Sequence, residues 1–173
     1  VISCPIDCYS GYSARSRDLV KAIIDLDRYD VKILPQRWGS TPWGFIEDNP
    51  EWEFLRKHII HNVTEQPDIW AQVTIPSEFQ PIGKYNIGFT AGIESTVCAP
   101  DWIEGLNKMD VTFVSSNHSK KVFETVGFDK KDEKTGQLIG KISLQKPVEV
   151  LFEGVNIDTY RPLKDTERSS INL

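Results

Sequence analysis

The chain has 173 residues, of which 39% are apolar and 26% are charged, and it carries a formal net charge of −5. This length suits one domain whose core can hold it together without disulfides or metal ions. The acidic balance argues against a nucleic-acid partner, because neutralising a phosphate backbone takes a basic face. No run of about 20 apolar residues occurs, and the first residues lack a basic leader. We therefore expect a cytoplasmic protein without a transmembrane segment.

The first 35 residues follow a strand, turn, helix and strand pattern. Residues 1–4 are a short apolar start, and a turn-rich segment around Gly11 follows them. Apolar residues at helical spacing then continue through about residue 27. Residues 29–34 are again strand-like, and Pro35 ends them. This order is typical of a βαβ unit, which implies parallel strands and a right-handed crossover.

The rest of the chain continues the alternation of predicted strands and helices. Residues 36–50 hold two glycines, two prolines and two tryptophans, and predict a loop. Asn49 and Pro50 then predict the start of a helix through about residue 61, because asparagine caps helices and proline suits the first turn. Further strands are predicted at 69–75, 85–90, 111–114 and 148–152. Further helices are predicted at about 100–107 and 119–126.

The segment 127–146 differs from its surroundings. It is charged, contains a Lys134-Thr135-Gly136 turn and has alternating apolar residues. This pattern predicts an exposed β-hairpin inserted before the last strand, with a partner-binding arm as the alternative. The whole chain is thus predicted to be an α/β protein. It would have a Rossmann-like open, mainly parallel sheet with helices on both faces.

In such sheets ligands bind outside the carboxyl ends of the strands, so the loops that follow the strands are the candidate sites. The first loop contains Gly11, before a helix whose free N–H groups can receive a phosphate or carboxylate. The alternative is a purely structural glycine. The segment matches neither G-x-G-x-x-G nor a phosphate-binding P-loop motif.

Two later loops also carry polar groups. Thr90 and Glu94 lie in the loop after residues 85–90, where a carboxylate beside hydroxyls can orient or deprotonate a substrate hydroxyl. The alternative is that Glu94 caps the next turn. Ser116 and Asn117 follow residues 111–114, and either one is also a candidate helix cap. His118 is the best placed of the three histidines, although the sequence pairs it with no nucleophile.

Other reactive residue types give weaker signals. His58 and His61 lie three apart, but no carboxylate or cysteine follows at ligand spacing. We therefore expect surface histidines and no metal site. Trp38 and Trp43 are interpreted as loop anchors, or alternatively as rings that stack on a sugar. The cysteines, an odd number, are expected to be reduced thiols; they are Cys4, Cys8 and Cys98.

The chain resembles the N-terminal, acceptor-side lobe of a retaining, nucleotide-sugar-dependent glycosyltransferase of the GT-B fold, similar to glycosyltransferase family 4. The most specific segment is the last, which resembles the signature that closes the first lobe of these enzymes. The segments that carry the resemblance are SGYSARSRDLVKAI, PDIWAQVTIPSEF, KYNIGFTAGIEST, PDWIEGLNKMDVTFVSSNHSKKVFE and PVEVLFEGVNIDTYRP.

The resemblance implies roles for particular residues. Gly11 and Tyr12 match the family's glycine turn, which approaches the donor phosphate and the acceptor. Thr90 falls in the loop after the fourth strand and would bind substrate. Glu94 stands in that loop where relatives place a polar residue facing the transferred sugar, which makes it the candidate catalytic residue. Ser116 and Asn117 match the loop that lines the cleft.

The resemblance also implies a function. The chain would be the acceptor-binding half of a metal-independent, hexosyltransferase-like enzyme that moves a sugar from a nucleotide-sugar donor to a hydroxyl acceptor. The donor is a co-substrate, so no cofactor is expected. Residues 1–162 would form the lobe and 163–173 a linker or tail. The donor-binding second lobe, in the same or another chain, would be absent here, so we expect the chain alone to be inactive.

Two other functions compete with this interpretation. One is a non-enzymatic α/β module that binds a small anion or a sugar. The other is an α/β hydrolase or phosphatase, which the sequence disfavours because it contains neither a G-x-S-x-G elbow nor a phosphate-binding cysteine loop.

Overall fold

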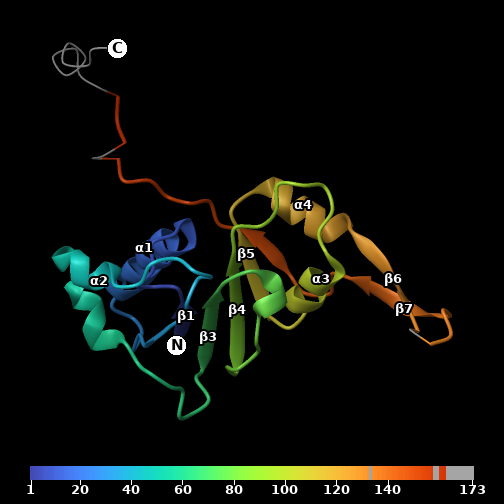
Figure 1. Cartoon of the computed structure of the whole chain (residues 1–173), viewed down its shortest axis with the longest axis horizontal. Helices are drawn as coiled ribbons and strands as arrows, with labels where there is room; N and C mark the ends of the chain where they lie inside the picture. Colours follow the sequence, from blue (N-terminus) through green and yellow to red (C-terminus); the bar gives the residue numbers. More distant parts are fainter. Residues whose placement is uncertain (133, 158–159, 163–173) are drawn as a thin grey trace.

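The computed structural model describes residues 1–132, 134–157 and 160–162 and shows one six-stranded sheet flanked by helices (Figure 1). The spatial order of the strands is β2-β1-β3-β4-β5-β8, and every neighbouring pair is parallel. The predicted Rossmann-like α/β fold is therefore confirmed. The strands are β1 Ile2–Cys4, β2 Ile33–Pro35, β3 Ile69–Val73, β4 Tyr85–Thr90, β5 Val111–Val114 and β8 Val148–Val150.

One further bridge extends the sheet beyond β2. Ile59 pairs in parallel with Ile33, and the N–H of Ile60 donates to the carbonyl of Ile33 at 2.8 Å. The chain therefore runs outward from β1 through β2 to Ile59, and then crosses back to β3 on the other side of β1. This reversal is the topological switch point of a doubly wound sheet, where such folds place their ligands.

Helices cover both faces of the sheet (Figure 1). One face carries α1 Gly11–Asp25, α2 Phe45–Asp48 and the 3₁₀ helix η1 Pro50–His58; the other carries the 3₁₀ helix η2 Pro76–Glu78, α3 Pro100–Leu106 and α4 Asn117–Thr125. The two faces have separate cores because side chains alternate along each strand. Ala71 of β3 packs in the first core, whereas its neighbour Trp70 packs in the second.

The segment between β2 and β3 differs from the prediction. The predicted loop 36–50 contains the short helix α2, and the predicted helix to residue 61 is a 3₁₀ helix that ends at His58. Trp52, Leu55 and His58, at intervals of three, are buried or half-buried, which suits three residues per turn; Phe54 is half-buried as well. Asn49 is the N-cap residue and Pro50 opens the helix, as predicted, but the Asn49 side chain makes no capping hydrogen bond; its Nδ2 donates to the carbonyl of Phe45 at 2.7 Å.

The exposed hairpin is confirmed. β6 Gly127–Lys131 pairs antiparallel with β7 Leu138–Ser143, and the ribbon projects away from the sheet (Figure 1). The carboxylate of Asp132 holds the turn by accepting the N–H groups of Lys134 and Thr135 at 3.0 and 2.7 Å.

The predictions for the cysteines, the histidines and the strand ends are confirmed only in part. The three cysteines are free, as predicted, and all are buried. His58 is not a surface histidine: its Nδ1 lies 3.0 Å from the carbonyl oxygen of Val31, and its buried Nε2 has no hydrogen-bond partner among the described residues. β3 ends at Val73 and β8 at Val150, earlier than predicted. The predicted linker or tail 163–173 lies outside the described residues.

Candidate functional site

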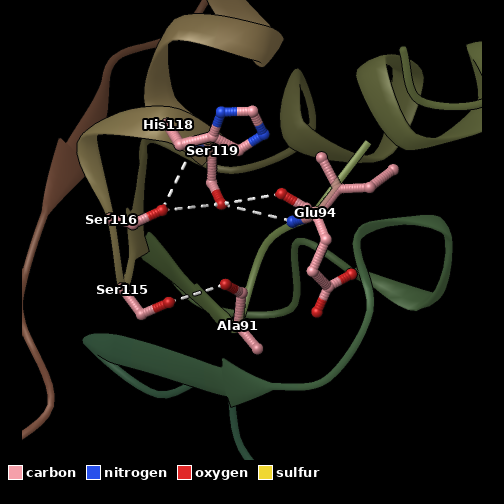
Figure 2. Close-up of a pocket in the computed structure, with 7 residues that line it drawn as sticks. Ala91, Glu94, Ser115, Ser116, His118 and Ser119 are labelled. Carbon is pink, nitrogen blue, oxygen red and sulfur yellow. Dashed lines mark hydrogen bonds between the residues drawn. The ribbon is translucent and has the colours of Figure 1, made fainter. Parts of the chain in front are cut away.

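The loop after β4 is fixed against the start of α4 (Figure 2). Gly92 has φ +90°, and a Cβ on it would lie 2.1 Å from the Oγ of Ser119. Only glycine therefore allows this approach. The Oγ of Ser119 in turn accepts the N–H of Ile93 at 3.2 Å and donates to its carbonyl at 3.3 Å. The backbone before Glu94 is consequently held in one place.

Hydroxyl groups at the end of β5 complete this arrangement (Figure 2). Ser116 is the N-cap of α4, as predicted, and its Oγ accepts the N–H of Ser119 at 3.1 Å. The Oγ of Ser115 donates to the carbonyl of Ala91 at 2.7 Å. Nε2 of His118 lies 3.2 Å from the carbonyl oxygen of Ser95, which can only accept, so Nε2 carries the proton.

These groups line a pocket of about 350 Å³, which we call the β4–β5 pocket; its lining residues are Ala91, Ile93, Glu94, Ser115, Ser116, His118 and Ser119. The side chain of Glu94 is exposed, and its carboxylate has no hydrogen-bond or ion-pair partner among the described residues. Figure 2 shows that carboxylate directed away from the His118 ring. The pocket thus offers an unpaired acceptor beside several hydroxyls.

The N-terminus of α4 adds donors to the same place. Within the described part of the chain, the backbone N–H groups of Asn117 and His118 have no acceptor, because the cap bonds only that of Ser119. Free N–H groups at a helix start favour negative charge. Asn117 itself is exposed and is not among the residues that line the pocket.

Tyr12 connects the loop after β1 to the loop after β4. Its hydroxyl lies 3.1 Å from the Oγ1 of Thr90 and accepts the N–H of Ala91 at 3.0 Å. Its ring stacks on Trp38 with a centroid separation of 4.0 Å. Gly11, next to Tyr12, is exposed, and apart from its chain neighbours and its own helix backbone no atom of the described residues lies within 4 Å of where a Cβ would be. The fold itself therefore makes no steric demand for glycine at position 11.

A buried arginine supports the loop between β1 and α1. Arg17 donates to the carbonyls of Ile6 and Cys8, both at 3.0 Å, and its guanidinium lies 3.4 Å from the centroid of the Phe45 ring. Burial lowers the pKa of Arg17, and nearby carboxylates partly oppose that shift. Because its donors are directed to backbone carbonyls, Arg17 stabilises the loop rather than presenting charge to a ligand.

Of the predicted site residues, the structure brings together two pairs. Tyr12 meets Thr90, and Glu94 shares a pocket with Ser116. Gly11 adjoins Tyr12 and Asn117 adjoins Ser116 in the chain, but neither is among the residues that line this pocket. Sequence reasoning did not identify Ser119 as the residue that anchors the Glu94 loop. No local signal marks it, because its partners Gly92 and Ile93 lie on a distant part of the sequence.

Fold and site together define a doubly wound α/β protein with a polar pocket at the carboxyl edge of its sheet. No protein-family model matches the chain, and comparisons with curated proteins and with solved structures gave no match either. Across the described ranges no three histidine, cysteine, aspartate or glutamate side chains gather as a metal-binding group. In those ranges, too, no helix has both the length and the apolar character needed to cross a bilayer.

Proposed function

We propose that the chain is the acceptor-binding lobe of a glycosyltransferase, which moves a sugar from a nucleotide-sugar donor to a hydroxyl acceptor. The observation that carries this proposal is the unpaired carboxylate of Glu94 in a hydroxyl-lined pocket at the carboxyl edge. A doubly wound sheet with its switch point beside β1 is the architecture that the sequence resemblance implies.

The chemistry of the β4–β5 pocket suits a hydroxyl substrate. A hydroxyl group both donates and accepts, so it can donate to the Glu94 carboxylate and accept from a serine hydroxyl or a free N–H at the start of α4. A carboxylate that receives the proton of an attacking hydroxyl contributes about 10²–10⁴-fold to a transfer rate. Glu94 is the residue we assign to this role.

The donor would be bound by a second lobe that faces the same edge. A nucleotide diphosphate carries several negative charges, and among the described residues that line the β4–β5 pocket none is a lysine or arginine. The pocket therefore suits the acceptor better than the diphosphate. On this proposal the chain alone binds acceptor but does not catalyse transfer.

The test is binding of hydroxyl acceptors to the chain, measured on an array of saccharides, glycolipid headgroups and hydroxyl-bearing peptides. Glu94→Gln should weaken binding of the best acceptor about tenfold, because one hydrogen bond to a charged group is lost. It should leave stability within about 0.5 kcal/mol, since Glu94 is exposed. Glu65→Gln, another exposed and unpaired glutamate among the described residues, is the matched control.

Two outcomes would contradict the proposal. One is tighter binding of nucleotide sugars than of any acceptor by the chain alone. The other is efficient sugar transfer by the 173 residues without a donor-binding lobe. A small anion that copurifies tightly with the chain would favour the non-enzymatic binding module instead.

A further inference from the structure

A second pocket lies at the other end of the carboxyl edge, beyond β2. It has a volume of about 380 Å³, and we call it the β2-edge pocket; its lining residues are Asp7, Leu34, Pro35, Trp43, Arg56, Ile59, Ile60 and His61. Its apolar lining includes Leu34, Pro35, Ile59 and Ile60, and its charged or titratable side chains come from two stretches of the chain, residue 7 and residues 56–61. The acceptor-binding proposal makes no use of this pocket, because none of its lining residues belongs to the β4–β5 pocket.

The backbone holds Trp43 in place at this pocket. Residue 43 forms an antiparallel bridge with Cys8, and the N–H of Gly44 donates to the carbonyl of Asp7 at 3.0 Å. The Trp43 side chain is nevertheless 42% exposed. The Arg37 guanidinium lies over the ring at 5.6 Å from its centroid. The part of the ring that is open to solvent, on a fixed backbone, is a platform on which a flat apolar ligand face can stack at low entropic cost.

Polar groups of both kinds surround the ring. Oδ1 of Asp7 accepts the N–H of Ile46 at 2.7 Å, while Oδ2 has no partner in the described ranges. Arg56 uses its Nε for Glu53 at 2.7 Å, which leaves its terminal nitrogens free to donate. His61 makes no hydrogen bond or ion pair with any described residue. The pocket therefore presents an acceptor, donors and an imidazole without partners.

The charges around Arg56 select the kind of ligand. The hydrogen bond that Arg56 donates to Glu53 raises the pKa of Arg56 most, and the charges of Glu53, Glu47 and Asp7 raise it further. A second guanidinium, that of Arg37, lies over the indole ring. The three carboxylates still outnumber the two guanidinium groups. An anionic ligand, such as a nucleotide, would be repelled by them. A neutral ligand with many hydroxyls would not.

We infer that the β2-edge pocket binds a neutral saccharide, with a pyranose ring stacked on Trp43 and its hydroxyls bonded to Asp7 and Arg56. A pyranose has an apolar C–H face for the indole, and each hydroxyl can donate to Oδ2 of Asp7 or accept from the guanidinium. This inference does not rest on the acceptor-binding proposal. The saccharide inference depends on Trp43, whereas the acceptor-binding proposal depends on Glu94.

The test follows the indole N–H signal of Trp43 in ¹H–¹⁵N spectra of the whole chain, assigned with Trp43→Phe. The probes are methyl glycosides of neutral hexoses, N-acetylhexosamines and pentoses, compared with glucuronic acid and uridine monophosphate. At least one neutral glycoside should shift this signal saturably, with a dissociation constant on the order of 1 mM.

Variants test which side chains bind the glycoside. Because Trp43→Phe and Trp43→Ala lack the indole signal, glycoside binding to them is measured by saturation-transfer NMR. Trp43→Ala should abolish binding, while Trp43→Phe should retain a weaker affinity because a ring still stacks. Asp7→Asn, which keeps an oxygen for the Ile46 N–H, should weaken binding about tenfold. Tyr29→Ala removes another exposed aromatic ring and should change nothing.

Several results would overturn the inference. One is that no neutral glycoside shifts the Trp43 signal. Another is that the anionic probes bind more tightly than the neutral glycosides. A third is that Trp43→Ala binds the glycoside as tightly as the parent chain. Glu94→Gln should leave the Trp43 titration unchanged while it weakens acceptor binding in the β4–β5 pocket. Failure of one proposal is therefore distinguishable from failure of the other.

Discussion

Asn86 and Asp110 at the amino edge of the parallel sheet differ from Glu94 and His61 at its carboxyl edge in how their polar groups are paired. At the amino edge, Asn86 is saturated: its Oδ1 accepts the N–H of Gly83 at 2.8 Å, and its Nδ2 donates to the Gly83 carbonyl at 3.1 Å. Asp110 accepts the backbone N–H of Asn86 at 2.8 Å and lies 3.4 Å from Lys146. At the carboxyl edge, Glu94 and His61 have no such partners among the described residues.

This difference separates stabilising from binding groups. A paired polar group near the surface has its hydrogen bonds met by the protein, so it strengthens the fold and has little to offer a ligand. An unpaired carboxylate in a pocket adds little to stability and is available to a ligand. The contrast agrees with the general rule that open α/β sheets bind at their carboxyl ends.

The largest expected effect concerns the loop that presents Glu94. Gly92→Ala should lower the free energy of unfolding by about 3 kcal/mol, because it adds a Cβ 2.1 Å from Ser119 Oγ at a φ of +90°. Gly136→Ala, with φ +71° and open space around it, should cost about 1 kcal/mol. Gly11→Ala, with neither constraint, should stay within about 0.5 kcal/mol. Urea unfolding measures all three.

If Gly92→Ala costs no more than Gly136→Ala, the contact with Ser119 does not constrain the loop. The carboxyl edge would then hold its pocket less firmly than the structure shows.

The next effect concerns the amino edge. Asp110→Asn should lower the unfolding free energy at neutral pH by about 1–2 kcal/mol, because hydrogen bonds to a charged acceptor are weakened. The backbone N–H of Asn86 lowers the pKa of Asp110 below its ordinary value of 3.8. Its stabilisation is therefore complete above that pH and is lost as the pH falls through the lowered value.

Urea unfolding at pH 7 and pH 3 checks this prediction. The loss of stability on acidification should be smaller in Asp110→Asn than in the parent chain. Asp129→Asn is the control, because Asp129 is exposed and has no partner among the described residues. An equal loss of stability in the parent and in Asp110→Asn would show that the amino edge is not stabilised through this carboxylate.

The smallest effect concerns the contact between the loops after β1 and β4. Tyr12→Phe should lower the unfolding free energy by only about 0.5–1 kcal/mol, because the exposed N–H of Ala91 can bond water instead and the stack on Trp38 remains. Tyr29→Phe, whose hydroxyl has no partner in the described ranges, should have no effect. A loss above about 2 kcal/mol in Tyr12→Phe would contradict this prediction, because the hydroxyl would then stabilise the fold more than one exposed hydrogen bond accounts for.

Much of the fold could be predicted because its signals are local. The strands β4 and β5, the hairpin and the cap at Ser116 follow from alternation, turn residues and capping within a few positions of sequence. The region between β2 and β3 could not be predicted as well. There, burial of Trp52, Leu55 and His58 at intervals of three accompanies a 3₁₀ helix, and Ile59 pairs with Ile33 at the edge of the sheet.

The sequence by itself determined that this is a parallel α/β protein and that Glu94, Thr90 and Ser116 follow strands. Only the tertiary structure decided which of these loops meet, that Gly92 lies against Ser119, and that Trp43 lines a second pocket. The physical reason is the distance along the sequence over which each effect acts. Propensity, alternation and capping act over a few residues, whereas pockets form from segments tens of residues apart, whose approach depends on the packing of the whole sheet.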